Sequence, residues 1–183
     1  MKRRSLLQAG LALAGAALLT GHSPYRQWYA FGPKHWLIVA ARGDAEACRL
    51  ADAVSALLTV RVPGSQTMPT QAETERHVVQ LLRTHQLELA IVGIDAANGA
   101  LSGGASFPEG PVALRTVAPF GPHLLVALEG YPTDKAARIA AALAGFRWQD
   151  GSVPTRGSGP QSKVPLHPGA IRFKQARESK TGQ

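Results

Sequence analysis

The sequence has 183 residues, and its 20 lysines and arginines against 12 aspartates and glutamates give a net charge of +8. The excess lies at the two ends: residues 22–150 hold eleven charges of each sign, residues 1–21 hold three basic residues and no acid, and residues 151–183 hold six basic residues against one acid. A neutral middle argues against a folded nucleic-acid-binding domain, which would carry a basic face. The single cysteine, Cys48, excludes an intramolecular disulfide and a cysteine-based zinc site.

The amino-terminal segment is typical of an export signal. Basic residues precede an uncharged run over residues 6–19, built of leucine, alanine and glycine plus Gln8. Arg3 and Arg4 also fit the twin-arginine pattern, so the twin-arginine and general export routes both stay open. We expect residues 1–21 to be an export signal or signal-anchor. The protein would then be periplasmic, either soluble after cleavage or tethered to the inner membrane.

Residues 22–34 form an aromatic juxtamembrane linker in this interpretation. Four aromatic side chains alternate there with two basic ones. Such rings favour a membrane–water interface, but they would serve equally well if they folded back on the domain. Both interpretations remain open.

The middle of the chain alternates between strand and helix patterns. A continuous apolar run predicts a strand over residues 35–41, buried on both faces. Asp44 can cap a helix whose apolar residues recur at three- and four-residue steps as far as Leu58. Residues 59–62 predict a short second strand.

A capping-box pattern at residues 70–73 predicts a helix through about Thr84, and residues 87–92 predict a third strand. Asp95 is placed to cap a short segment, which a loop rich in glycine, serine and proline follows. Two more strands over 112–118 and 123–128 precede a final helix that begins near Pro132.

This order predicts an α/β fold, a single three-layer lobe over residues 35–150 with a mainly parallel sheet and helices on both faces. Residues 151–183 are expected to be a Gly/Pro-rich basic tail. Its basic residues could lie on anionic lipid or an acidic partner, or form a solvated end; they are Arg172, Lys174, Arg177 and Lys180.

Ligands of such sheets bind beyond the carboxyl ends of the strands, and polar side chains follow three of the predicted strands. Arg42 and Gly43 follow the first strand, where backbone amides at a helix start favour an anion. The other candidates to line the same crevice are Ser65, Gln66, Thr70, Gln71, Asp95 and Asn98. Helix capping explains Thr70 and Asp95 equally well, and a solvated Arg42 beside a capped helix is the alternative at the first strand.

The sequence indicates neither an enzyme nor a cofactor. No set of nucleophile, base and orienting group can be assembled, and the histidines lack the spacing of metal ligands. Cys48 lies on or beside the apolar face of the first helix, where a buried thiol is expected instead of a reactive one.

Three passages of the sequence resemble the TAXI family of TRAP transporter extracytoplasmic solute receptors. They are a helix and strand passage over residues 73–92, the segment ALRTVAPF over residues 113–120, and the motif PLHPGAIRF over residues 165–173, which is the most specific. The resemblance implies one lobe of a type II periplasmic binding protein. The receptors have two lobes, whereas here residues 120–143 already resemble the family's late segment. Arg42 and Gly43 stand where the family has a Gly-Gly-x-Tyr-Tyr loop.

The resemblance implies an exported solute-binding component of a TRAP transporter for a small organic acid. A membrane subunit of such a transporter would be its partner. The alternative is a membrane-tethered scaffold or protein-interaction module, derived from such a receptor and without a small-molecule ligand.

Overall fold

The computed structural model describes residues 35–147 and 161–181. The expected export segment over residues 1–21 and the aromatic linker over residues 22–34 lie outside the described residues, as do residues 151–160. Membrane anchoring, signal cleavage and the export route therefore stay predictions.

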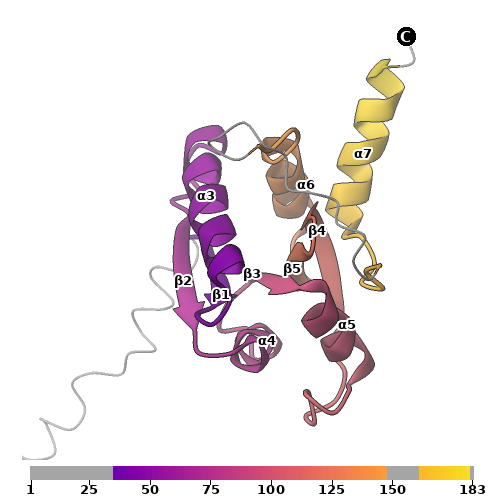
Figure 1. The fold of residues 1–183 in the computed structure, drawn as a ribbon. Helices are drawn as coiled ribbons and strands as arrows, with labels where there is room; N and C mark the ends of the chain where they lie inside the picture. The colour runs from indigo at the N-terminus through magenta and orange to yellow at the C-terminus, as the bar shows by residue number, and fades with distance from the viewer. Residues whose placement is uncertain (1–34, 148–160, 182–183) are drawn as a thin grey trace, which may run out of the picture. The chain divides into compact units, whose positions relative to one another are not determined.

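Five strands form one mixed sheet in the order β2-β1-β3-β5-β4 (Figure 1). They are β1 (Leu37–Ala41), β2 (Met68–Ala72), β3 (Leu89–Gly93), β4 (Leu114–Phe120) and β5 (His123–Leu128). β1 pairs in parallel with β2 and β3, whereas β5 is antiparallel to both β3 and β4. The α/β class is thus confirmed, but a mainly parallel sheet is only partly met, because a two-residue turn between β4 and β5 can join only antiparallel strands.

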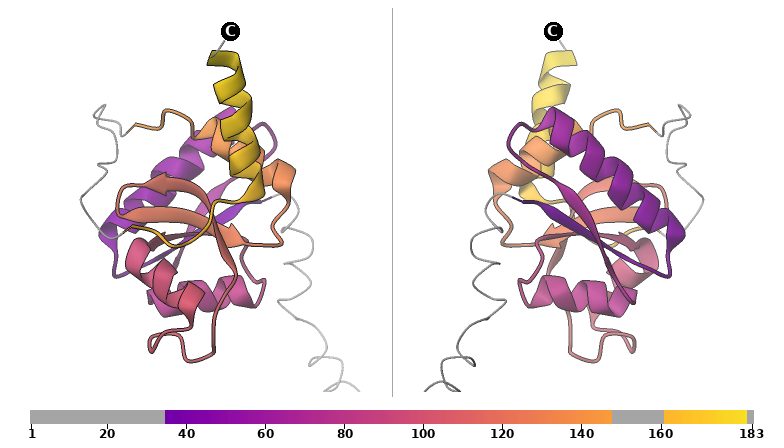
Figure 2. Two further views of the ribbon diagram at one scale, coloured as in Figure 1. Left: turned by 90° about the vertical axis from the view of Figure 1, so that its right-hand side faces the viewer. Right: turned by 90° about the vertical axis from the view of Figure 1, so that its left-hand side faces the viewer.

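Helices cover both faces of this sheet (Figures 1 and 2). α3 (Ala45–Arg61) and α6 (Thr133–Ala142) pack on one face, and α4 (Glu75–Arg83) and α5 (Ile94–Ser102) pack on the other. β1 serves both layers, since Ile38 and Ala40 join the core beneath α3 while Val39 and Ala41 join the core beneath α4. The alternation explains why this strand is apolar throughout its buried part.

The predicted strand over residues 59–62 is wrong, because α3 continues through Arg61. Val62, which caps the helix, lies four residues after Leu58, and both side chains are buried on the same helix face. Val60 between them points to solvent and is 79% exposed. The β-branched residues of this stretch favour a strand by composition, but the helical apolar period runs through them.

The second strand is β2 instead, at the edge of the sheet. It carries the sequence MPTQA, in which only Ala72 is buried. The proline is tolerated because one side of an edge strand needs no backbone donor. The predicted capping box over residues 70–73 is therefore part of β2 and its end, and Thr74 caps α4 by accepting a hydrogen bond from the His77 amide at 3.1 Å.

The carboxyl-terminal segment folds onto the lobe and forms the long helix α7 (Pro168–Thr181). Leu166 makes a parallel bridge with Thr116, whose amide donates to the Pro165 carbonyl and whose carbonyl accepts from the His167 amide, both at 2.8 Å. The free edge of β4 is thereby covered, which removes a site for unwanted strand pairing. The later part of α7 projects beyond the rest of the lobe, and the side chains of residues 174–179 are exposed (Figure 2).

His167 and Gly169 secure this docking. The His167 ring has no exposed surface; it accepts from the Gly169 amide at Nδ1, and its Nε2 lies 3.1 Å from the Tyr131 carbonyl. Nε2 therefore carries the proton of a neutral ring, and burial lowers the pKa of His167 in agreement. Gly169 contacts α6 so closely that no side chain fits there.

Gly169→Ala is expected to destabilise the fold by about 1–3 kcal/mol, the usual cost of overpacking. The added Cβ would overlap the Thr133 carbonyl oxygen and lie 2.7 Å from the Ala137 amide nitrogen. Chemical denaturation measures the loss. Gly130→Ala is the matched control, because nothing lies within 4 Å of a Cβ at that position; equal stability of the two variants would contradict the docking.

Candidate functional site

The structure places Ser65 and Gln66 at the amino edge of the sheet, because β2 begins only at Met68. The Ser65 hydroxyl is buried, donates to the Leu58 carbonyl at 3.2 Å and accepts from the Thr67 hydroxyl at 3.1 Å. Its role is to join the end of α3 to the start of β2. Ser65 and Gln66 therefore do not lie beside Asp95 and Asn98, the candidates that follow β3.

Thr70 and Gln71 lie within β2 and line a hollow of about 250 Å³ beside α3. Cys48, Ala51 and Asp52 form its other side. Cys48 is partly exposed, and its thiol donates to the Ala41 carbonyl at 3.3 Å. Burial, with help from the neighbouring carboxylates, raises the pKa of Cys48, so the thiol stays protonated and weakly nucleophilic.

Asp95 and Asn98 both belong to α5, whose cap is Gly93 and not Asp95. Asp95 is exposed in the first turn. The Asn98 side chain accepts from the Lys163 amide at 2.7 Å and donates to the Gln161 carbonyl at 3.3 Å. Asn98 therefore holds the carboxyl-terminal segment in place.

At the carboxyl ends of β1 and β3, two ionisable side chains do lie together, Asp44 and His123. His123 is not among the candidates predicted from the sequence. Asp44 caps α3 as predicted, accepting from the Ala47 amide at 2.9 Å. Its second carboxylate oxygen lies 2.7 Å from Nε2 of His123, the first residue of β5. His123 is only 6% exposed, and its Nδ1 has no hydrogen-bond partner among the described residues.

Other backbone groups of this edge are also satisfied from within the chain. The Glu75 carboxylate accepts from the Gly93 amide at 3.1 Å, and the Ile94 amide donates to the Pro122 carbonyl at 2.9 Å. The Arg42 amide donates to the Ala72 carbonyl at 2.7 Å, while the Arg42 side chain is exposed. The amides of Arg42, Gly93 and Ile94 thus have partners without a ligand.

The charge of this edge is acidic. Arg42 is exposed there, and Arg76, in the first turn of α4, is paired with Glu109. The acidic residues that follow the three parallel strands are Asp44, Glu46, Glu73, Glu75 and Asp95. Such a surface opposes a small carboxylate and favours a basic group.

Metal ligands do not gather in residues 35–147 and 161–181, where no group of three or more histidine, cysteine, aspartate or glutamate side chains is placed to hold an ion. Within the same residues, every helix is too short or too polar to cross a membrane.

Comparison with known proteins finds no protein-family model that matches the sequence and no curated protein with significant similarity.

Asp44 should make the lobe sensitive to acid. Partial burial alone would raise its pKa, but the Ala47 amide and His123 outweigh burial and hold the pKa below the ordinary 3.8. A lowered folded-state pKa gives stability that is present above about pH 4 and is lost as the pH falls through the folded value. Asp44→Asn keeps a capping oxygen but cannot ionise, so its unfolding free energy should be lower at pH 7 and should change less below pH 4.

Denaturation measured from about pH 5 to pH 2 covers this window. Asp95→Asn is the matched control, an exposed first-turn acid with no capping bond. An Asp44→Asn variant with the acid response of the unmodified chain would refute the role of the Asp44–His123 pair.

Proposed function

We propose that the chain is an exported, single-lobe relative of the TAXI solute receptors that works as a protein-interaction module. It would not enclose a small ligand at the ends of its strands. The observation that carries the proposal is the junction of β4 and β5, where Gly121 and Pro122 alone join the strands. The resemblance locates the missing second lobe near this junction. The single lobe would therefore present to another protein its carboxyl edge, the surface formed by the residues that follow β1, β2 and β3.

The distribution of the candidate residues supports this choice. Ser65 lies at the amino edge, Asn98 binds the segment over residues 161–163, and Thr70 lies in the edge strand. A small ligand gains affinity when convergent polar groups bury most of its surface. These side chains do not converge, and the acidic edge would repel the carboxylate that a TAXI-type receptor is expected to bind.

The carboxyl-terminal motif has packing roles that need no ligand. Leu166 pairs with β4, the His167 ring is buried, and Gly169 contacts α6. These contacts within one lobe explain why each of these residues stands at its position. The motif therefore carries no argument about a solute.

The partner that the resemblance implies is the membrane subunit of a TRAP transporter. Export by residues 1–21 would put the lobe in the periplasm, and an uncleaved segment would hold it beside the inner membrane. An acidic edge suits a partner with lysine or arginine side chains on the facing surface.

A receptor for a small organic acid is the second candidate, favoured by one feature. The exposed Arg42 stands at the end of β1, directly before the capped start of α3. An arginine there can form charge-assisted hydrogen bonds with a carboxylate.

Thermal unfolding in the presence of small organic acids separates the two candidates. A ligand at 100 times its dissociation constant stabilises a protein by about 2.7 kcal/mol. We expect that Arg42→Ala responds to every acid as the unmodified chain does, because no acid binds at the strand ends. Stabilisation by an acid that disappears in Arg42→Ala would establish the receptor and reject the proposal.

Site-specific photo-cross-linking tests the interaction module. A photoreactive residue replaces Glu73 at the carboxyl edge or Gln80 on α4, both exposed, in the full chain produced in cells with a periplasm. We expect a discrete adduct from position 73 that weakens at high salt, and none from position 80. No adduct from position 73, or equal adducts from both positions, would contradict docking through this edge.

A further inference from the structure

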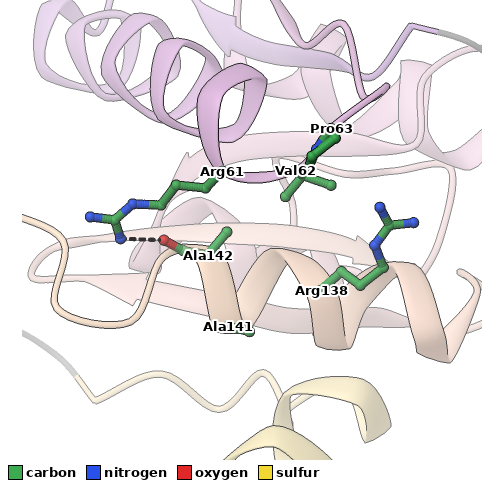
Figure 3. A pocket seen from close by; sticks show the side chains of 6 residues that line it. All are labelled: Arg61, Val62, Pro63, Arg138, Ala141 and Ala142. Carbon is green, nitrogen blue, oxygen red and sulfur yellow. Dashed lines mark hydrogen bonds between the residues drawn. The ribbon is translucent and has the colours of Figure 1, made fainter.

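A second hollow lies at the opposite edge of the lobe. It is a groove of about 510 Å³ between the ends of α3 and α6, lined by Arg61, Val62, Pro63, Arg138, Ala141 and Ala142 (Figure 3). α3 begins at the carboxyl edge with Asp44 and ends here, so the groove is separate from the candidate site described above. Its volume lies in the range of small-molecule sites.

The groove combines an apolar floor with two guanidinium groups. Val62 and Ala142 are buried and form the floor, whereas Arg61 and Arg138 are exposed. Figure 3 shows the two guanidinium groups toward opposite ends of the groove, with Val62 and Ala142 between them. No acidic side chain is among the lining residues.

Arg138 has neither an ion pair nor a hydrogen bond with the described part of the chain. Its natural partner would be Asp134, one turn earlier on α6, but the Asp134 carboxylate binds Arg172 at 2.9 Å. Arg138 therefore offers an unused planar fork of donors, which suits carboxylate and phosphate oxygens.

Arg61 has a structural bond and spare donors. Its Nη1 donates to the Ala142 carbonyl at 2.8 Å, which neutralises part of the negative end of α6. Each helix end contributes only about half a negative charge, so the two full positive charges leave the groove cationic.

We propose that this groove binds a small organic anion, with its oxyanion on Arg138 and its apolar body over Val62 and Ala142. Arg61 receives a second anionic group where the ligand has one. The site lies apart from the strand ends, and it does not require the interaction proposed for the carboxyl edge.

Calorimetric titration of the full chain with glutarate, benzoate and inorganic phosphate at low salt tests the inference, with the neutral glutaramide as the matched probe. We expect glutarate and benzoate to bind and glutaramide not to bind. Arg138→Ala should weaken binding about tenfold or more, the effect of losing a charge-assisted hydrogen bond, without changing the melting temperature. Phosphate binding alone, or glutaramide binding as tightly as glutarate, would overturn the apolar organic anion as ligand.

Arg42→Ala is the control at the other edge, and it should bind all probes as the unmodified chain does. Amide NMR shifts on titration should centre on Val62 and Ala141. The inference fails if no organic anion binds saturably, or if Arg138→Ala binds as tightly as the unmodified chain. Binding that Arg42→Ala abolishes and Arg138→Ala leaves intact also overturns it, and would assign the anion to the strand ends instead.

Discussion

The turn of Gly121 and Pro122 is the constraint on which the rest of the lobe depends. Gly121 has a φ of +63°, a left-handed conformation that glycine adopts without strain. The turn reverses the chain at once, so β5 runs back between β3 and β4 and pairs His123 with Gly93. The same register brings His123 to Asp44 and the Pro122 carbonyl to the Ile94 amide. This one turn thereby supplies partners from within the chain to Asp44 and to the Ile94 amide at the carboxyl edge.

The two edges of the lobe differ in chemistry although the middle of the sequence is neutral. Acidic first turns of α3, α4 and α5 make the carboxyl edge negative. The groove at the other end of α3 carries two arginines and no acid. The surface proposed for a basic partner and the groove proposed for an anion can thus coexist on one small domain, because they lie at opposite edges.

The elements that the sequence predicted well are those that packing dictates on both sides. β1 and β3 are continuous apolar runs, and the period of α3 follows its buried face. β2 escaped prediction because an exposed edge strand shows no alternation. The Asp44–His123 pair escaped because its members are 79 residues apart, and only the β4–β5 turn joins them. Likewise, the arginines of the groove come from separate helices, and no local pattern connects them.

At the carboxyl edge, the amides of Gly93 and Ile94 have partners within the chain, so no small ligand is needed to satisfy them. Amide hydrogen exchange of the full chain tests it directly at Gly93 and Ile94, whose amides donate to Glu75 and Pro122. We predict that both amides exchange slowly in the absence of any ligand, like their core neighbours in β3, and that organic acids change their rates no more than those of these neighbours. Rapid exchange of the Gly93 and Ile94 amides without ligand, slowed selectively by an organic acid, would show instead that a ligand completes this edge.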